Sequence, residues 1–113
     1  MLTLLSVYSE SARQDFLLPT AENVTLCARA ERFGLGRDIA LTLSAAGGWH
    51  FTGSCTASLR HAGIPYAGQP VQAGDSLAYC ISGRVALVLL VRQQALPFAA
   101  YDRYRVRPGS IYI

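Results

Sequence analysis

Short segments of this chain alternate between apolar and polar residues, and residues that favour turns separate them. In residues 39–43, Ile39, Leu41 and Leu43 fall on one face of an extended backbone. Such alternation is typical of a β-strand with one buried face. The same reasoning predicts strands over residues 2–8, 16–18, 23–27, 49–52, 55–60, 76–81 and 85–92.

Turn signals separate these segments at the spacing that antiparallel β proteins show. They fall at residues 45–48, 61–63, 73–75 and 82–84, which are rich in glycine, serine, alanine and aspartate. No segment shows a sustained helical period, so the pattern predicts an all-β fold without helices, in an antiparallel sandwich or barrel. The nearly continuous apolar run 85–92 predicts a central strand covered on both faces.

The length of 113 residues suits one domain. Near the end of the chain, Pro108 and Gly109 predict a turn, and residues 110–113 begin another β run. We interpret this run as the first strand of a new unit. The sequence therefore predicts a β-sandwich over residues 1–107 and the start of a following domain or linker over residues 108–113.

The charge of the chain is mildly positive, with ten arginines, no lysine and seven acidic residues. Hydrophobic residues make up 51%, which excludes a disordered tail. The arginines are scattered except for Arg103, Arg105 and Arg107, which would share one strand face. This face either is solvated or contacts an anionic partner. Nucleic-acid binding is not expected, because no basic stripe runs along the chain, and no apolar run is long enough to span a bilayer.

Three cysteines, Cys27, Cys55 and Cys80, form an odd set that does not suit a disulfide scaffold. We expect free thiols in a reducing compartment, with Cys55 and Cys80 as small core residues. No spacing typical of metal ligands occurs around the cysteines or histidines, so neither a metal nor another cofactor is expected.

Nucleophilic catalysis would have to use His50 or His61, the two histidines of the chain. His50 is predicted on the solvent face of its strand, opposite Trp49 and Phe51, and His61 in a turn. No nucleophile elbow precedes a helix, so an enzyme using Cys55 or His61 is the weakest hypothesis. The glycines in residues 34–37 lack the pattern of a nucleotide-binding loop and predict a flexible loop between strands.

Residues 63–77, which include Gly74-Asp75, resemble the closing half of a forkhead-associated (FHA) domain. Residues 108–113 resemble the first strand of a second such domain, and the start of the chain is similar to the same tandem arrangement. The whole pattern resembles the N-terminal part of the FtsK/SpoIIIE-type membrane ATPases of Gram-positive type VII secretion systems. The resemblance implies an FHA-like antiparallel β-sandwich.

The chain departs from the motifs with which FHA domains read phosphothreonine. Residues 19–24 stand where an early Gly-Arg belongs, and His61-Ala62-Gly63 replaces the usual Asn-Gly. Ser58 and His61 have the spacing of the Ser-x-x-His motif but lie where the Asn-Gly motif should be. The resemblance therefore implies a degenerate FHA domain that does not read phosphothreonine.

These departures favour a non-enzymatic protein–protein interaction module on the cytoplasmic side of a cell-membrane secretion ATPase. Its partners would be proteins, among them other components of the secretion system. The alternative is a phosphothreonine-peptide-binding FHA domain in which Arg37 or Arg60 replaces the usual arginine. The loop residues Arg37, Arg60 and His61 are the candidate partner-binding residues.

Overall fold

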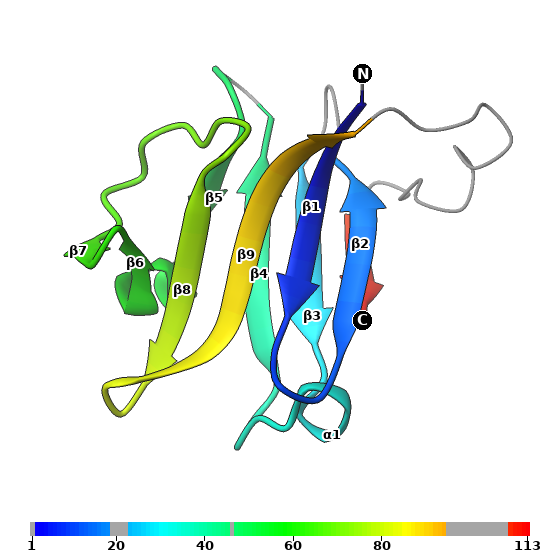
Figure 1. The fold of residues 1–113 in the computed structure, drawn as a ribbon, viewed down its shortest axis with the longest axis vertical. Coiled ribbons are helices and arrows are strands. Elements are labelled where there is room, and N and C mark those ends of the chain that lie inside the picture. Colours follow the sequence, from blue (N-terminus) through cyan, green and yellow to red (C-terminus); the bar gives the residue numbers. More distant parts are fainter. Residues whose placement is uncertain (1, 19–22, 46, 95–108) are drawn as a thin grey trace, which may run out of the picture.

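A computed structural model describes residues 2–18, 23–45, 47–94 and 109–113 and contains two β-sheets stacked face to face (Figure 1). Most of the described residues lie in strands, and only two short segments are helical. The prediction of an all-β sandwich is therefore confirmed.

The larger sheet has six strands in the order β2-β1-β9-β8-β6-β7. Its strands are β1 (Leu2–Tyr8), β2 (Arg13–Leu17), β6 (Leu59–His61), β7 (Ile64–Pro65), β8 (Ser76–Ile81) and β9 (Arg84–Gln94). The smaller sheet has the order β10-β3-β4-β5. It contains β3 (Val24–Ala28), β4 (Ile39–Ser44), β5 (His50–Thr52) and β10 (Gly109–Tyr112). Neighbouring strands run antiparallel except β10 and β3, which are parallel.

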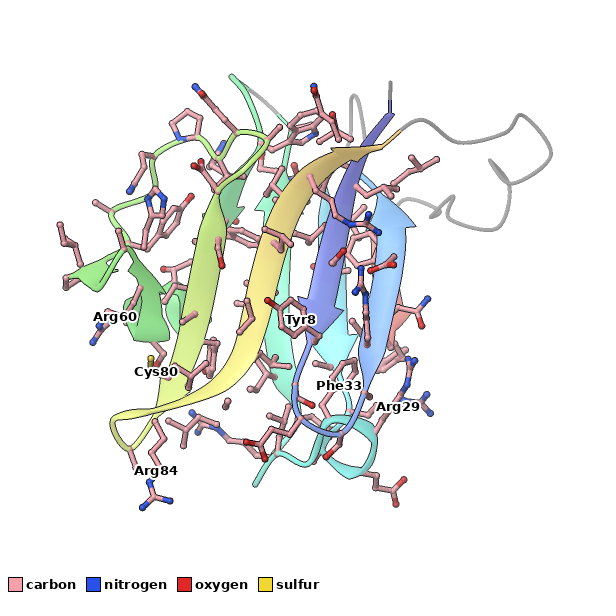
Figure 2. All side chains as sticks on the ribbon, in the orientation of Figure 1. Tyr8, Arg29, Phe33, Arg60, Cys80 and Arg84 are labelled. Carbon is pink, nitrogen blue, oxygen red and sulfur yellow. The ribbon has the colours of Figure 1, made fainter. Side chains whose placement is uncertain are left out.

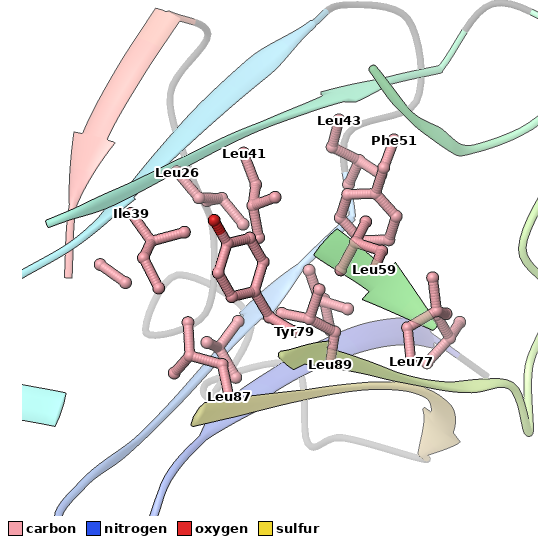
Figure 3. Packing of buried hydrophobic residues seen from close by; sticks show 14 of the residues in the cluster. Leu26, Ile39, Leu41, Leu43, Phe51, Leu59, Leu77, Tyr79, Leu87 and Leu89 are labelled. Atoms are coloured by element: carbon pink, nitrogen blue, oxygen red, sulfur yellow. The ribbon is translucent and has the colours of Figure 1, made fainter. Parts of the chain in front are cut away.

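The hydrophobic core fills the space between the two sheets. The predicted inner face of β4 is confirmed, because Ile39, Leu41 and Leu43 are at most 2% exposed. Tyr79 of β8 and Leu87 of β9 face them from the larger sheet (Figure 3). In both β3 and β4, every second side chain thus points into the core, as the alternation in the sequence predicts.

Strand β9 is central, as predicted, but only one of its faces is covered by the core. Leu87, Leu89 and Val91 are fully buried, whereas Val88 and Leu90 on the other face remain partly exposed. The prediction of burial on both faces is therefore wrong. The physical reason is that the second sheet packs against one face of β9, whereas the continuous apolar run suggested a layer on each side.

Two short helical segments contradict the prediction that the chain has no helix. Helix α1 (Ala30–Phe33) is one turn long, and the 3₁₀ helix η1 (Ser54–Ser58) replaces most of the strand predicted over residues 55–60. At the start of η1, the backbone N–H and the hydroxyl of Thr56 both donate to the carbonyl of Gly53. Segments this short carry too few residues to show a helical period.

The C-terminal residues belong to the same sandwich, in contrast to the boundary predicted after residue 107. Strand β10 pairs with β3, and the backbone N–H of Ile113 donates to the carbonyl of Cys27. The Ile113 side chain is 6% exposed and belongs to the core cluster. The β run was predicted correctly, but its partner is a strand more than 80 residues away, which local sequence does not reveal.

Two tight hairpins connect strands of the larger sheet. Ser82 and Gly83 join β8 to β9, and both have positive φ angles, as do Ala62 and Gly63 between β6 and β7. Two-residue hairpins with positive φ at both positions match the right-handed twist of the strands they connect. The turns predicted at these places are confirmed, although His61 itself is the last residue of β6.

Candidate functional site

The β1–β2 turn, the loop after α1 and the β8–β9 hairpin lie at the same end of the sandwich (Figure 1). Residues of all three line a groove. It has a volume of about 670 Å³. A smaller depression of about 450 Å³ adjoins it, and Gly36 and Ile81 line both. We call the two together the loop-end groove. Its other lining residues are Tyr8, Ser9, Glu10, Ser11, Phe33, Gly34, Leu35, Arg37, Ser58, Cys80, Ser82, Arg84, Val85, Ala86 and Val88.

The loop after α1 forms one wall and is held to the helix at both ends. The carboxylate of Asp38 accepts a hydrogen bond from the backbone N–H of Ala30 (2.8 Å). Gly34 ends the helix in the left-handed conformation, and the N–H of Leu35 donates to the carbonyl of Ala30. Phe33, which is 1% exposed, anchors this segment in the core. Residues 35–37 thus lie between two hydrogen bonds to Ala30, in the connection between α1 and β4.

Two glycines of this wall are expected to respond to alanine in opposite directions. Gly34→Ala should lower the free energy of unfolding by about 1–2 kcal/mol, because φ is +69° and the new Cβ would lie 2.8 Å from the Ser11 hydroxyl. Gly36→Ala should raise it by about 0.4–1 kcal/mol, because φ lies outside the left-handed region and no atom stands within 4 Å. Urea denaturation of both variants measures the difference, and equal effects would contradict the assigned backbone.

The β8–β9 hairpin forms the opposite wall and contains a β-bulge. Tyr79 pairs with Leu87 whereas Cys80 pairs with Val85, so Ala86 is an extra residue on β9. A bulge bends its strand and redirects the neighbouring side chains. Val85 is consequently 60% exposed at the groove, although strict alternation would have placed it on the buried face with Leu87. The groove thus gains an exposed apolar side chain.

Charged residues stand around this apolar lining. Arg84 projects from the tip of the β8–β9 hairpin, away from the sheets (Figure 2). Arg37 lines the smaller depression together with Ser58 and Ser82, and Glu10 lines the larger part. Within the part of the chain that the structure describes, neither Arg37 nor Arg84 forms an ion pair or a side-chain hydrogen bond. These two guanidinium groups are therefore available to a ligand.

The three residues predicted to bind a partner are not brought together. Arg37 lies at the groove, but Arg60 donates through Nη1 to the carbonyls of Ala57 and Leu59. The His61 side chain lies near a carboxylate: its Nε2 is 3.6 Å from Oδ1 of Asp75. Asp75 itself accepts a hydrogen bond from the N–H of Gln72, which confirms its predicted role in a turn. Arg60 and His61 thus have intramolecular partners.

The residues considered for catalysis or metal binding are dispersed. Nδ1 of half-buried His50 lies 2.9 Å from the carbonyl of Gly48, and Phe51 beside it is buried, as predicted. Cys27 and Cys80 are free, and Cys80 lines the groove instead of entering the core. Among the described residues, no three metal-binding side chains form a group. The helices in this part of the chain are too short to span a bilayer.

Cys80 differs from its prediction because it directly follows buried Tyr79, and alternation along β8 places it on the face away from the core. The Cys55 side chain and the arginines Arg103, Arg105 and Arg107 lie outside the described parts of the structure. The predictions made for them stay predictions.

A second group of charges lies on the open face of the larger sheet, away from the core. Arg92 donates to the hydroxyl of Ser6 (2.9 Å) and to the carboxylate of Asp15 (3.1 Å), and Arg13 donates to Asp15 as well (3.0 Å). Burial raises the pKa of Asp15, but hydrogen bonds from Ser6 and Arg13 and the charges of Arg13 and Arg92 outweigh it and lower the pKa. These groups form hydrogen bonds and ion pairs with one another across β1, β2 and β9, and these interactions stabilise the sheet.

This cluster predicts an acid-dependent loss of stability. Because the folded-state pKa of Asp15 lies below the ordinary value of 3.8, its contribution is complete above that value and is lost as the pH falls through the lower pKa. Asp15→Asn should lower the free energy of unfolding by about 1–3 kcal/mol at pH 7 and much less at pH 2. Urea denaturation at both pH values measures this difference. An equal loss at the two values would contradict the lowered pKa.

Comparison of the chain with protein-family models, with curated proteins and with solved structures finds no match in any of the three. The structure itself shows an all-β sandwich with a partly apolar groove at one end. Sequence reasoning identified Arg37 but missed Glu10, Arg84 and Val85. The serine–glycine turn before Arg84 was a signal for the hairpin, whereas the bulge left no sign in the sequence.

Proposed function

We propose that this domain is a non-catalytic protein-interaction module whose loop-end groove binds a peptide segment of a partner. The single observation that carries the proposal is the combination, in one groove, of exposed Val85 with Arg37 and Arg84, both without partners among the described residues. Peptide-binding sites commonly combine an apolar surface with a few polar groups that fix the orientation of the ligand. The hydrogen bonds that tie residues 35 and 38 to Ala30 would lower the entropic cost of binding.

The motif resemblance adds a cellular setting to this proposal. As a degenerate FHA domain of a type VII secretion ATPase, the module would face the cytoplasm and bind another component of the secretion system. The ATPase activity would belong to other parts of that protein. Because a β-sandwich serves many functions, the fold alone does not choose among them, and the groove carries the argument.

Filling the groove tests the proposal. Gly36 lines both parts of the groove, and a Cβ at this position would meet no atom within 4 Å, so a tryptophan introduced there places a large side chain at both parts. Random peptides displayed on phage are selected on the unmodified domain and then measured against Gly36→Trp and Gly36→Ala. We expect the affinity of the selected peptides for the Gly36→Trp variant to be about tenfold lower or more. Their affinity for the Gly36→Ala variant should equal that for the unmodified domain. Equal binding to all three proteins would refute the groove as the site.

Phosphothreonine-peptide binding is the second candidate function. It is favoured by one observation: Arg37, Ser58 and Ser82 line the same depression, and arginine with hydroxyl groups suits a phosphate. Arg60, the other candidate for this role, already donates to two backbone carbonyls. A phosphothreonine peptide library, with the unphosphorylated library as the control, tests this candidate. Binding that requires both the phosphate and Arg37 would establish it and replace the first proposal.

A further inference from the structure

The charges along the loop-end groove are uneven. Glu10 and Arg84 belong to its larger part, whereas Arg37 belongs to the smaller depression, which contains no acidic residue. The carboxylate of Asp38, the neighbour of Arg37 in sequence, accepts a hydrogen bond from the backbone N–H of Ala30. The smaller depression is therefore the most positive part of the groove within the described residues.

The apolar surface lies next to this positive region. Ile81 lines both parts of the groove, and the exposed side chain of Val85 stands beside it on the hairpin. A ligand side chain that covers Val85 would remove apolar surface from water, while an adjacent anionic group would reach a guanidinium that has no partner among the described residues. Glu10 would repel an anionic group placed at the far end of the larger part.

Resting on the function proposed above, we infer that the groove selects an acidic segment of a protein partner, one rich in carboxylates. An apolar side chain of the segment covers Val85 and Ile81, and carboxylates next to it contact Arg37 and Arg84. Arg37 and Arg84 provide the attraction for carboxylates, and Glu10 determines which end of the groove they occupy. The selection rests on charge complementarity between these arginines and the ligand.

A set of short synthetic peptides tests this inference. All have a central leucine, which is flanked by glutamates, by glutamines or by lysines, and a fourth peptide carries phosphothreonine among glutamines. Fluorescence anisotropy at low salt measures their affinities. We expect the glutamate peptide to bind about tenfold more tightly than the glutamine peptide and the lysine peptide to bind most weakly.

Variants identify the residues responsible. Arg37→Ala should lower the affinity for the glutamate peptide about tenfold, and Glu10→Gln should raise that affinity about twofold. Arg29→Ala is the control, because Arg29 is exposed and does not line the groove, and its Nε donates to the carbonyl of Ile113; the substitution should change affinity less than about twofold. All three substituted side chains are exposed, so the variants should fold.

The outcomes separate this inference from the function on which it rests. If the glutamine or phosphothreonine peptide binds as tightly as the glutamate peptide and Gly36→Trp abolishes that binding, selection for acidic segments is wrong while the groove remains a peptide site. If Arg37→Ala and Arg29→Ala weaken the glutamate peptide equally, the attraction is unspecific and the inference is wrong. If no peptide of the set binds, the inference also fails, and the phage selection independently decides the proposed function.

Discussion

Replacing Phe51 by alanine is expected to lower the free energy of unfolding by about 3–5 kcal/mol, because the substitution removes a large buried ring. Phe51 is 1% exposed, and its ring packs edge-on against Tyr66 with the centroids 6.1 Å apart. The loss combines the apolar surface of the ring with a cavity between β5 and the larger sheet. Denaturant unfolding measures it directly.

Tyr66, the ring's partner, bridges two segments through hydrogen bonds that do not use the Phe51 side chain and that the alanine variant keeps. Its hydroxyl donates to the carbonyl of Gln69 (2.6 Å) and accepts a hydrogen bond from the N–H of Phe51 (3.0 Å). Burial raises the pKa of Tyr66, and the hydrogen bond from Phe51 opposes that increase. Thr52→Ala, at a half-exposed neighbouring position, is the control and should cost less than about 1 kcal/mol. Similar losses at Phe51 and Thr52 would contradict the packing between the sheets.

Ending the chain after Arg107, where the sequence predicts the domain boundary, is expected to lower the free energy of unfolding by about 2–5 kcal/mol. This range corresponds to the removal of one buried aliphatic side chain, here Ile113, which is 6% exposed. The pairing of β10 with β3 would be lost as well. Thermal and urea denaturation of the shortened and complete chains provide the comparison.

Two single substitutions separate the loss of the side chain from the loss of the strand. Ile113→Ala should reproduce most of the effect, whereas Tyr112→Ala, at a position that is 72% exposed, should change stability by less than about 0.5 kcal/mol. If the chain that ends at residue 107 is as stable as the longer one, residues 108–113 form a separate unit, as the sequence pattern predicted.

Much of the fold could be predicted because alternation reports burial in a two-layer sandwich. Strands β4 and β8 were predicted almost to their bounds, since alternate side chains of each are buried and each ends at a recognisable turn. Strand β1 was predicted from its apolar run, and the four consecutive residues 4–7 are buried, on both faces of the strand. The partners of the strands could not be predicted in the same way. The parallel pairing of β10 with β3 depends on residues that are far apart in the chain, and alternation contains no information on it.

The groove was less predictable than the sheets. Arg37 was a candidate because it is an arginine in a predicted loop, but its position beside Ser58 and Ser82 requires the loop after α1 and the β8–β9 hairpin to meet. The exposure of Val85 results from the bulge, so an apolar run suggested a buried strand where the structure has part of a surface groove. Local pattern predicts which face of a strand is buried, but bulges and loop contacts determine what a site presents.

The most direct test of the proposed binding site is the NMR spectrum of the isotope-labelled domain during titration with a phage-selected peptide. If the peptide binds in the loop-end groove, the backbone amides of residues 34–38 and 81–86, which form its two walls, shift together as the peptide is added. Shifts confined to β5 and β7, with the amides of the groove unchanged, would contradict the proposed site.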